Sequence, residues 1–150
     1  GHLEEIYSNS SYASIQALND PWSSAGHTVL DLGDDVFTRG RPHPMIDHRL
    51  RNDRLIAEAE NPETAVILFD VVLGHGAHED PVAAMAPALT EIRDRHNGNG
   101  PVLLGFVCGT DGDPQGIARQ KSALTELGVA LADNNAQAVR TARAILGDAS

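Results

Sequence analysis

AVILFDVVLGHGAHEDP, residues 65–81, is the stretch that decides the expected fold. Its first nine residues are apolar apart from Asp70 and rich in β-branched side chains, which is typical of a strand buried on both faces in a parallel sheet. A Gly-His-Gly turn follows, and then Asp80 and Pro81 supply a helix N-cap and a first helical residue. The stretch therefore predicts a buried strand, a short loop and a helix that continues to about His96.

The same rhythm of strand, loop and helix extends on both sides of this stretch. Further strands are expected at TVLDL (28–32), PVLLGFVCG (101–109) and VALAD (129–133), each bounded by Gly, Pro or Asp. Helices are expected at residues 45–60, at 114–127 after Asp113 as N-cap, and at 134–146. Before His27 the sequence is rich in Ser and Asn and predicts at most one strand, at residues 5–8.

Alternating strands and helices of this kind predict an α/β protein with a flavodoxin-like, three-layer open parallel sheet of four to five strands in the order 2-1-3-4-5. We expect one domain over residues 1–150, with an irregular segment at 1–26 and regular βα units at 27–150. In such sheets ligands bind at the carboxyl ends of the strands, near the point where the strand order reverses. The loop that carries His75 should lie beside that crevice.

Composition narrows the classes of partner. The chain has 11 Lys and Arg against 21 Asp and Glu, a formal charge of −10 that disfavours nucleic acid and anionic membranes as partners. No apolar run is long enough for a membrane helix. Cys108 is the single cysteine, which excludes an intrachain disulfide and a multi-cysteine zinc site and fits a cytoplasmic location.

His75 is the first candidate site residue. A histidine between two glycines before a helix could donate to a phosphate or carboxylate, because the helix N-terminus offers N–H groups and a positive dipole end. Alternatively it only fills a tight turn. His75 and His78 also read as H-x-x-H, a possible metal pair, but no third ligand is fixed in space and we assign no metal site.

A second candidate region is the loop GDDVFTRGRPH, residues 33–43, which is expected to lack secondary structure. Its Arg39 and Arg41, with His43, could bind a carboxylate or phosphate. Alternatively the arginines pair with Asp34, Asp35 or Asp47 and hold the loop shut. Cys108 ends a predicted strand, and a buried structural role is the simpler interpretation for it.

No dinucleotide fingerprint, P-loop or nucleophile elbow follows any predicted strand. Several longer stretches carry a resemblance instead: the Ser-rich turn after EEIY, LGDD with MID opening a helix, NPETAVILFD leading to LGHG, and PVLLGFVCGT followed by LTELGVALADN. In these the chain resembles the ligase domain of the succinyl-CoA synthetase α subunit. Through DPWSSAGHTVLDLGDDVFTRGRPHPMIDHRLRNDRL and AVILFDVVLGHGAHEDP it resembles more closely the FdrA family of acyl-CoA-synthetase-like proteins.

The resemblance implies a five-stranded ligase domain that ordinarily follows a CoA-binding domain, which is absent from this chain. It implies acyl transfer among CoA, phosphate and nucleotide through a phosphohistidine, and for FdrA-type proteins carbamoyl transfer involving oxamate and phosphate in purine nitrogen metabolism. The interval that would hold the phosphohistidine is here GTDGDPQG, residues 109–116, without histidine. Val72 replaces the carboxylate that supports it, so His75 is not the phosphoryl carrier.

We therefore expect a ligase domain of an FdrA-like protein that contributes to acyl or carbamoyl transfer, with the isolated domain inactive. The alternatives are a non-catalytic subunit-assembly module and, more weakly, a metal-binding domain using His75 and His78. A small anionic substrate, an upstream CoA-binding domain or partner subunits, and an oligomeric state are expected, with no cofactor in this domain and CoA or phosphate in the full-length protein. The candidate anion-binding residues are Asn9, Ser10, Arg39, Arg41, His43, Gly74, His75, Gly76, Gly109 and Thr110.

Overall fold

The computed structural model describes residues 6–11 and 15–147 and divides the chain into two compact units, of which the first ends at Pro44 and the second begins at Met45. The fold is α/β with parallel sheets, as the sequence predicts. The described residues form two three-stranded parallel sheets, in the orders β2-β1-β3 and β4-β5-β6.

The N-terminal unit contains β1 (Ile6–Ser8), β2 (Gln16–Ala17), β3 (His27–Val29) and the short helix α1 (Asp35–Thr38). β1 pairs with β3, as expected, and its other edge, expected beside the strand at 65–73, pairs with β2. The strand expected at 28–32 ends early because the Asp31 carboxylate accepts a hydrogen bond from the Gly33 N–H and turns the chain. Of the strand expected at 5–8, Glu5 lies outside the described residues.

Residues 33–43 are not without secondary structure, contrary to expectation, because Asp34 starts α1 within them. Its side chain accepts a hydrogen bond from the Val36 N–H at 3.0 Å, and Phe37 on the same helix is buried. A side-chain N-cap of this kind satisfies one of the N–H groups that a helix start leaves open. The loop is therefore partly ordered by its own acidic residue.

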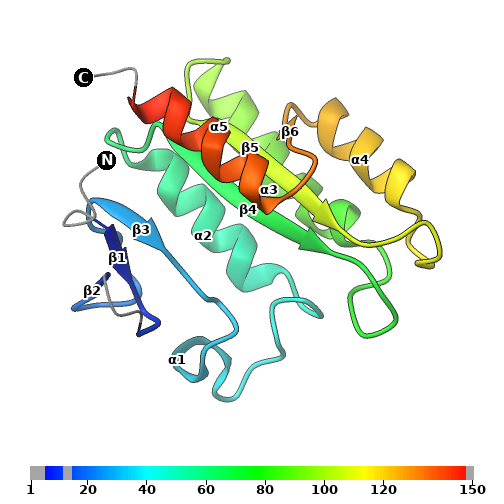
Figure 1. Cartoon of the computed structure of the whole chain (residues 1–150), viewed down its shortest axis with the longest axis horizontal. Coiled ribbons are helices and arrows are strands. Elements are labelled where there is room, and N and C mark those ends of the chain that lie inside the picture. Colours follow the sequence, from blue (N-terminus) through cyan, green and yellow to red (C-terminus); the bar gives the residue numbers. More distant parts are fainter. Residues whose placement is uncertain (1–5, 12–14, 148–150) are drawn as a thin grey trace. The chain divides into compact units, whose positions relative to one another are not determined.

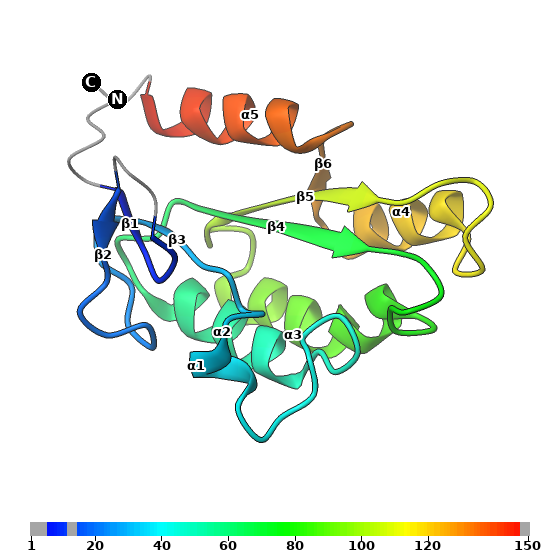
Figure 2. The ribbon, with the colours of Figure 1, turned by 60° about the horizontal axis from the view of Figure 1, so that its bottom comes forward.

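The C-terminal unit contains the sheet of β4 (Val66–Val72), β5 (Val102–Cys108) and β6 (Ala130–Leu131). Its helices are α2 (Arg49–Glu60), α3 (Pro81–His96), α4 (Ile117–Glu126) and α5 (Asn135–Gly147). Figures 1 and 2 show α2 and α3 on one face of β4 and β5, and α5 on the other. No helix among the described residues is both long enough and apolar enough to cross a membrane.

The two faces of this sheet are filled by alternate residues of the strands. Ile67, Phe69, Val71 and Leu73 join the main core, which includes Leu55 of α2, Leu89 of α3 and Leu124 of α4. Leu104 of β5 belongs to a smaller cluster with Ala138 of α5. This alternation is what a strand buried between two helical layers requires.

The predicted start of α3 is confirmed, whereas two other predicted helix starts are wrong. α2 begins at Arg49 because the Asp47 carboxylate accepts the Arg49 N–H at 3.0 Å, which leaves Ile46 outside the helix and exposed. α4 begins at Ile117 because Asp113 bonds backward to the Thr110 N–H at 2.6 Å instead of capping forward. Gly128 after α4 has a positive φ of 86°, as expected at a helix C-terminus.

Candidate functional site

The loops that follow β4 and β5 lie together at the carboxyl ends of these strands. The Leu73 N–H donates to the Cys108 carbonyl at 2.9 Å, which extends the ladder by one bond beyond the paired residues Val72 and Cys108. A Cβ added at Gly109 would lie 2.9 Å from Leu73 Cβ, so only glycine fits this close approach. The structure thus brings Gly74, His75 and Gly76 into the same region as Gly109 and Thr110.

Gln115 joins the two loops. Its side-chain oxygen accepts the Gly74 N–H at 3.1 Å, while its Nε2 donates to the Gly74 carbonyl at 2.7 Å and to the His78 carbonyl at 3.1 Å. Gln115 is only 3% exposed, so these bonds are sheltered from competing water. The turn that carries His75 is therefore fixed at both of its ends by one side chain.

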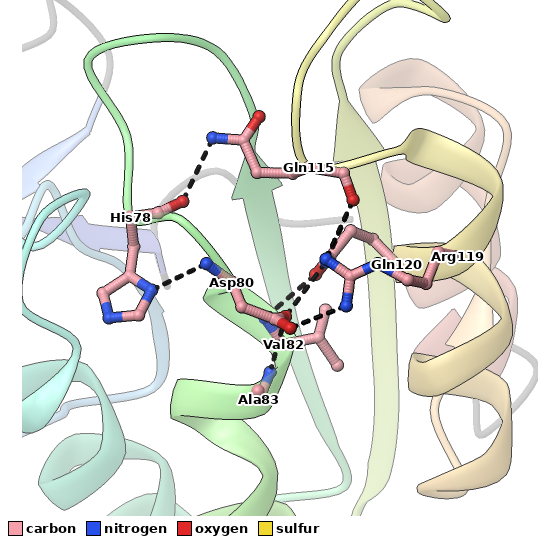
Figure 3. Close-up of polar contacts among 7 residues, drawn as sticks. All are labelled: His78, Asp80, Val82, Ala83, Gln115, Arg119 and Gln120. Atoms are coloured by element: carbon pink, nitrogen blue, oxygen red, sulfur yellow. Dashed lines mark hydrogen bonds and ion pairs between the residues drawn. The ribbon is translucent and has the colours of Figure 1, made fainter.

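The N-terminus of α3 is filled by the protein's own side chains (Figure 3). Gln120 Oε1 accepts the Val82 N–H at 3.1 Å, and Asp80 Oδ1 accepts the Ala83 N–H at 3.2 Å. Asp80 Oδ2 also accepts a hydrogen bond from Arg119 Nη1 at 2.6 Å, and Asp80 Oδ1 accepts one from Gln120 Nε2 at 3.0 Å. These two N–H groups of the helix start, which the sequence suggested as donors to an anion, are thus used internally.

The same contacts set the charge of the Asp80 carboxyl group. Burial by itself would raise its pKa, but the hydrogen bonds from Arg119, Gln120 and the Ala83 N–H outweigh burial and hold the pKa below its ordinary value. Asp80 is therefore ionised at neutral pH. A negative charge at this position stabilises the positive end of the α3 dipole.

His75 and Gly76 form the exposed tip of the turn. Gly74 before them has a φ of 127°, a conformation that strongly favours glycine. Within residues 6–11 and 15–147 no acceptor binds the backbone N–H of His75 or Gly76. Both N–H groups and the ring can therefore meet a ligand from solvent, and His75 keeps its place as a candidate contact.

His78 is held in a way that argues against a metal role. Its Nδ1 accepts the Asp80 N–H at 3.0 Å, so in the neutral ring the proton is on Nε2 and neither nitrogen offers a lone pair to a metal. Among the described residues, no cluster of three or more His, Cys, Asp or Glu side chains is arranged to hold a metal ion.

His48, the N-cap residue of α2, is a buried polar side chain that the sequence analysis did not single out. It is 5% exposed, and both of its ring nitrogens are buried without a hydrogen-bond partner among the residues that the structure describes. Its ring packs edge to face against the ring of His78, with the two ring centres 5.5 Å apart. Burial lowers the pKa of His48 to about 4, with a further contribution from the positive charge of Arg51, so the ring is neutral at pH 7.

In the N-terminal unit, Asn9 joins the ends of β1 and β3. Its Nδ2 donates to the Asp31 carbonyl and its Oδ1 accepts the Asp31 N–H, both at 2.9 Å. The Ser10 N–H donates to Ser8 Oγ at 3.1 Å. The Asn9 amide is thus engaged in holding two strands together, and its role as an anion contact stays a prediction.

Arg39, Arg41 and His43 are all exposed on one short segment of this unit. Arg41 lies over the ring of Trp22, with its guanidinium carbon 5.8 Å from the ring centre. The predicted pairing of the arginines with Asp34, Asp35 or Asp47 does not occur among the described residues, since Asp47 pairs with Arg49 instead. His43 packs against Gly33, where an added Cβ would lie 2.5 Å from His43 Nε2.

Thr110 and Cys108 lie at the end of β5, and both are exposed. The Thr110 hydroxyl and the Thr110 N–H both donate to the Asp113 carboxylate, the hydroxyl at 3.3 Å. Thr110 therefore belongs to a turn that is closed by hydrogen bonds. Cys108 is an exposed free thiol, not the buried residue that we expected, because the strand ends at its position.

Sequence reasoning missed the residues that build these loops. Gln115 and Gln120 gave no signal, since a glutamine reaches across loops without any characteristic spacing. The contact of Trp22 with Arg41 spans 19 residues and could not be read from a local pattern. A weak signal did exist for the Trp22 turn, because DPWS contains an Asp that can bond to its own backbone two residues on.

A family model described as CoA-ligase matches residues 8–145, which is most of the chain. The uncharacterized protein YahF of Escherichia coli (strain K12) is 43% identical over 133 residues, which cover 87% of this chain and 26% of YahF. The chain therefore spans about a quarter of the length of this curated relative.

Proposed function

Because the chain belongs to the CoA-ligase family, we propose that it is the ligase-type domain of a larger acyl-CoA-synthetase-like protein of the FdrA type. In this proposal the domain takes part in transferring an acyl or carbamoyl group to or from phosphate, with oxamate or a similar small acid as acceptor. The transfer proceeds without a phosphohistidine on this chain.

One observation carries the proposal: the interval between β5 and α4 is a short, closed turn without histidine. Residues 109–116 are tied by Asp113 to Thr110, and Gln115 fixes the neighbouring turn at Gly74. A phosphohistidine mechanism needs a histidine on a segment that can move the phosphoryl group from one site to the other. This turn contains no histidine and is closed by hydrogen bonds, so direct transfer between bound reactants fits the loops better.

Direct transfer between an acyl or carbamoyl donor and phosphate needs oriented donors for oxygen anions. In the C-terminal unit these are the His75 ring and the N–H groups of His75 and Gly76, which the Gln115 bonds hold in place. A separate set of such donors, proposed within the N-terminal unit alone, is Arg39 and Arg41. CoA, an upstream CoA-binding domain, partner subunits and an oligomeric state belong to the proposal for the full-length protein.

The test uses the full-length protein with its partner subunits. We expect turnover of carbamoyl phosphate with oxamate, and no protein-bound phosphohistidine when labelled phosphate donors are supplied. His75→Ala, Arg39→Ala and Arg41→Ala should each lower kcat/KM by about tenfold or more, a loss of roughly 1.4 kcal/mol in transition-state stabilisation. Arg143→Ala, at an exposed arginine of α5, is the matched control.

Unchanged affinity and turnover in all three variants would exclude these residues from the proposed reaction. A stable phosphohistidine on this chain would overturn the proposed direct transfer.

A second function, that of an assembly module, is favoured by a separate observation. Apolar side chains on the α5 face of the C-terminal unit are exposed: Leu68, Val102, Val139, Ile145 and Leu146. Exposed apolar patches of this kind often mark protein interfaces. If assembly is the only function, Val139→Asp with Leu146→Asp should dissociate the complex on size exclusion, while the His75 and arginine variants turn over normally.

A further inference from the structure

Two arginines of the N-terminal unit stand apart from most of the others in the protein. Six arginines form ion pairs with carboxylates, namely Arg49, Arg51, Arg54, Arg93, Arg95 and Arg119. Within the described residues Arg39 and Arg41 form none, although acidic residues outnumber basic ones by 21 to 11 in the sequence. Two exposed guanidinium groups thus stay available in a strongly acidic protein.

Arg41 is supported by an aromatic stack. Its guanidinium lies over Trp22, 5.8 Å from the ring centre, and Trp22 meets Phe37 edge to face at 4.9 Å with an angle of 81° between the rings. Phe37 is 2% exposed and anchors the stack, whereas Trp22 is 49% exposed. A guanidinium that rests on an aromatic face keeps the N–H groups along its edge free to bind an oxygen anion.

Two acidic residues help to build this stack. Asp20 accepts the Trp22 N–H at 3.0 Å and the Ser23 hydroxyl at 3.1 Å, and so fixes the turn that carries Trp22. Asp34 accepts the Val36 N–H and starts the helix that carries Phe37. Each acid is thus engaged with groups of its own turn.

The backbone between the two arginines is also defined. The Arg39 N–H donates to the Asp35 carbonyl at 3.1 Å, and the Arg41 N–H donates to the Thr38 carbonyl at 2.9 Å. Gly40 between them has a φ of 79°, which a residue with a side chain rarely adopts. Both arginine side chains therefore leave a short, ordered turn, and binding has to immobilise few backbone angles.

From these contacts we propose that Arg39, Arg41 and Trp22 form a binding site for a small anion with at least two oxygens on one centre, a carboxylate or a phosphate. Arg41 donates two N–H groups to the oxygens, in the forked geometry that a guanidinium shares with these anions. Arg39 adds a second positive charge. Trp22 is a positioning residue, which holds the Arg41 plane and forms one wall of the site.

That the bound anion is a reactant rests on the proposed function. That an anion binds at Arg39 and Arg41 does not depend on the proposed function.

The experiment follows the emission of Trp22, the single tryptophan of the chain, during titration of the full chain with inorganic phosphate and, separately, with oxamate. Chloride at equal ionic strength controls for screening of charge. We expect a saturable change in emission for one or both anions and none for chloride. The two titrations distinguish a phosphate site from a carboxylate site.

Variants identify the donors. Arg41→Ala and Arg41→Lys should both weaken binding by about tenfold or more, because a lysine cannot replace a forked, stacked donor. Arg39→Ala should weaken it less. Arg143→Ala, which removes from α5 an exposed charge that forms no ion pair with the described residues, should leave the affinity unchanged. A response to chloride, no saturation with either anion, or equal losses in Arg143→Ala and Arg41→Ala would overturn the site.

The role of Trp22 is tested by calorimetry, since its variants lose the optical signal. Trp22→Phe keeps an aromatic face for Arg41 and should retain most of the affinity, whereas Trp22→Ala should lose about as much as Arg41→Ala. Rescue by phenylalanine separates positioning from a general effect on folding. Equal affinities in the alanine and phenylalanine variants, whether both high or both low, would remove Trp22 from the site.

Failure of this site and failure of the proposed function give different results. If Arg41→Ala abolishes anion binding but the full-length protein with the same substitution turns over normally, the anion site is supported and the proposed reaction at it is excluded. If Arg41→Ala lowers the turnover of the full-length protein while the wild-type chain shows no saturable anion binding, the anion site is excluded and the transfer reaction is supported.

Discussion

A buried histidine without hydrogen-bond partners, such as His48, makes stability depend on pH. Its folded-state pKa of about 4 lies below the ordinary value of 6.5, because burial disfavours the charged ring. As pH falls, the unfolded chain therefore takes up this proton first. The contribution of His48 to stability is complete above pH 6.5 and is lost between pH 6.5 and about pH 4.

We predict that His48→Leu removes most of this acid sensitivity and raises stability at pH 7 by about 1 kcal/mol, since it replaces an unsatisfied buried polar group with an apolar one. Urea unfolding at several pH values from 4 to 7.5 measures both effects. His75→Gln, at an exposed histidine of the same unit, should keep the wild-type pH profile. If His48→Leu keeps that profile too, protonation of His48 is not the cause.

Gly109 is a second residue whose role the contacts define. An added Cβ would lie 2.9 Å from Leu73 Cβ and Cδ1 and 3.0 Å from the Asp113 carboxylate. Gly109→Ala should therefore destabilise the protein by about 1–3 kcal/mol, because the two loops must separate. Thermal unfolding monitored by circular dichroism measures the loss.

Gly112→Ala in the same loop is the control, since the nearest atom to its added Cβ is 3.7 Å away. We expect almost no change in stability there. Equal effects at both positions would show that the loop is adaptable and that the approach of Leu73 is not limiting.

At the scale of a single element, α3 shows how a helix start can be completed from a distant helix. Gln120 of α4 is fully buried and accepts the Val82 N–H while donating to Asp80. Gln120→Leu leaves the Val82 N–H without an acceptor and should cost about 1–3 kcal/mol in the free energy of unfolding. Hydrogen exchange of the first turn of α3 should rise in the same variant.

Ser122→Ala, at an exposed position of α4, provides the comparison, because its hydroxyl donates to the Glu126 carboxylate at the surface. A Gln120→Leu protein with unchanged exchange at Val82 and Ala83 would contradict a capping role for Gln120.

The sequence predicted α3 better than α4, and a difference between two Asp-Pro pairs explains why. Asp80-Pro81 and Asp113-Pro114 are the same helix-start signal, yet Asp80 caps forward onto Ala83 while Asp113 bonds backward to Thr110. The direction that an Asp side chain takes depends on which N–H groups its neighbours leave open, and local sequence does not encode it. The buried strands β4 and β5 were predictable because burial on both faces leaves a continuous apolar run.

For the candidate site, local patterns found residues but not their partners. Arg39, Arg41 and His75 stand out in the sequence because they lie among glycines in loops. Their supports, Trp22 and Gln115, come from other loops of the same units. Long-range contacts of this kind depend on how the chain folds back, which spacing alone does not contain.

At the scale of the whole molecule, the main core lies within the C-terminal unit. Its members run from Leu55 to Val129, and the smaller cluster around Leu104 lies in the same unit. We therefore predict that residues 45–150, produced alone, fold cooperatively. Circular dichroism should show a sigmoidal thermal transition, and amide resonances should be well dispersed.

The intact chain is the control for this fragment. Its C-terminal unit should show the same pattern of slowly exchanging amides in β4 and β5 as the fragment does. A fragment that melts without a transition would show that residues before Met45 are required for folding.

The stack on Trp22 and the exposed end of β5 have one more consequence. The sequence contains one tryptophan and one cysteine, and Trp22 lies in the N-terminal unit while Cys108 lies in the C-terminal unit. Both side chains are exposed. This chain thus carries a donor and an attachment point for an acceptor dye, so resonance energy transfer within it can measure the separation of the two units, before and after an anion binds.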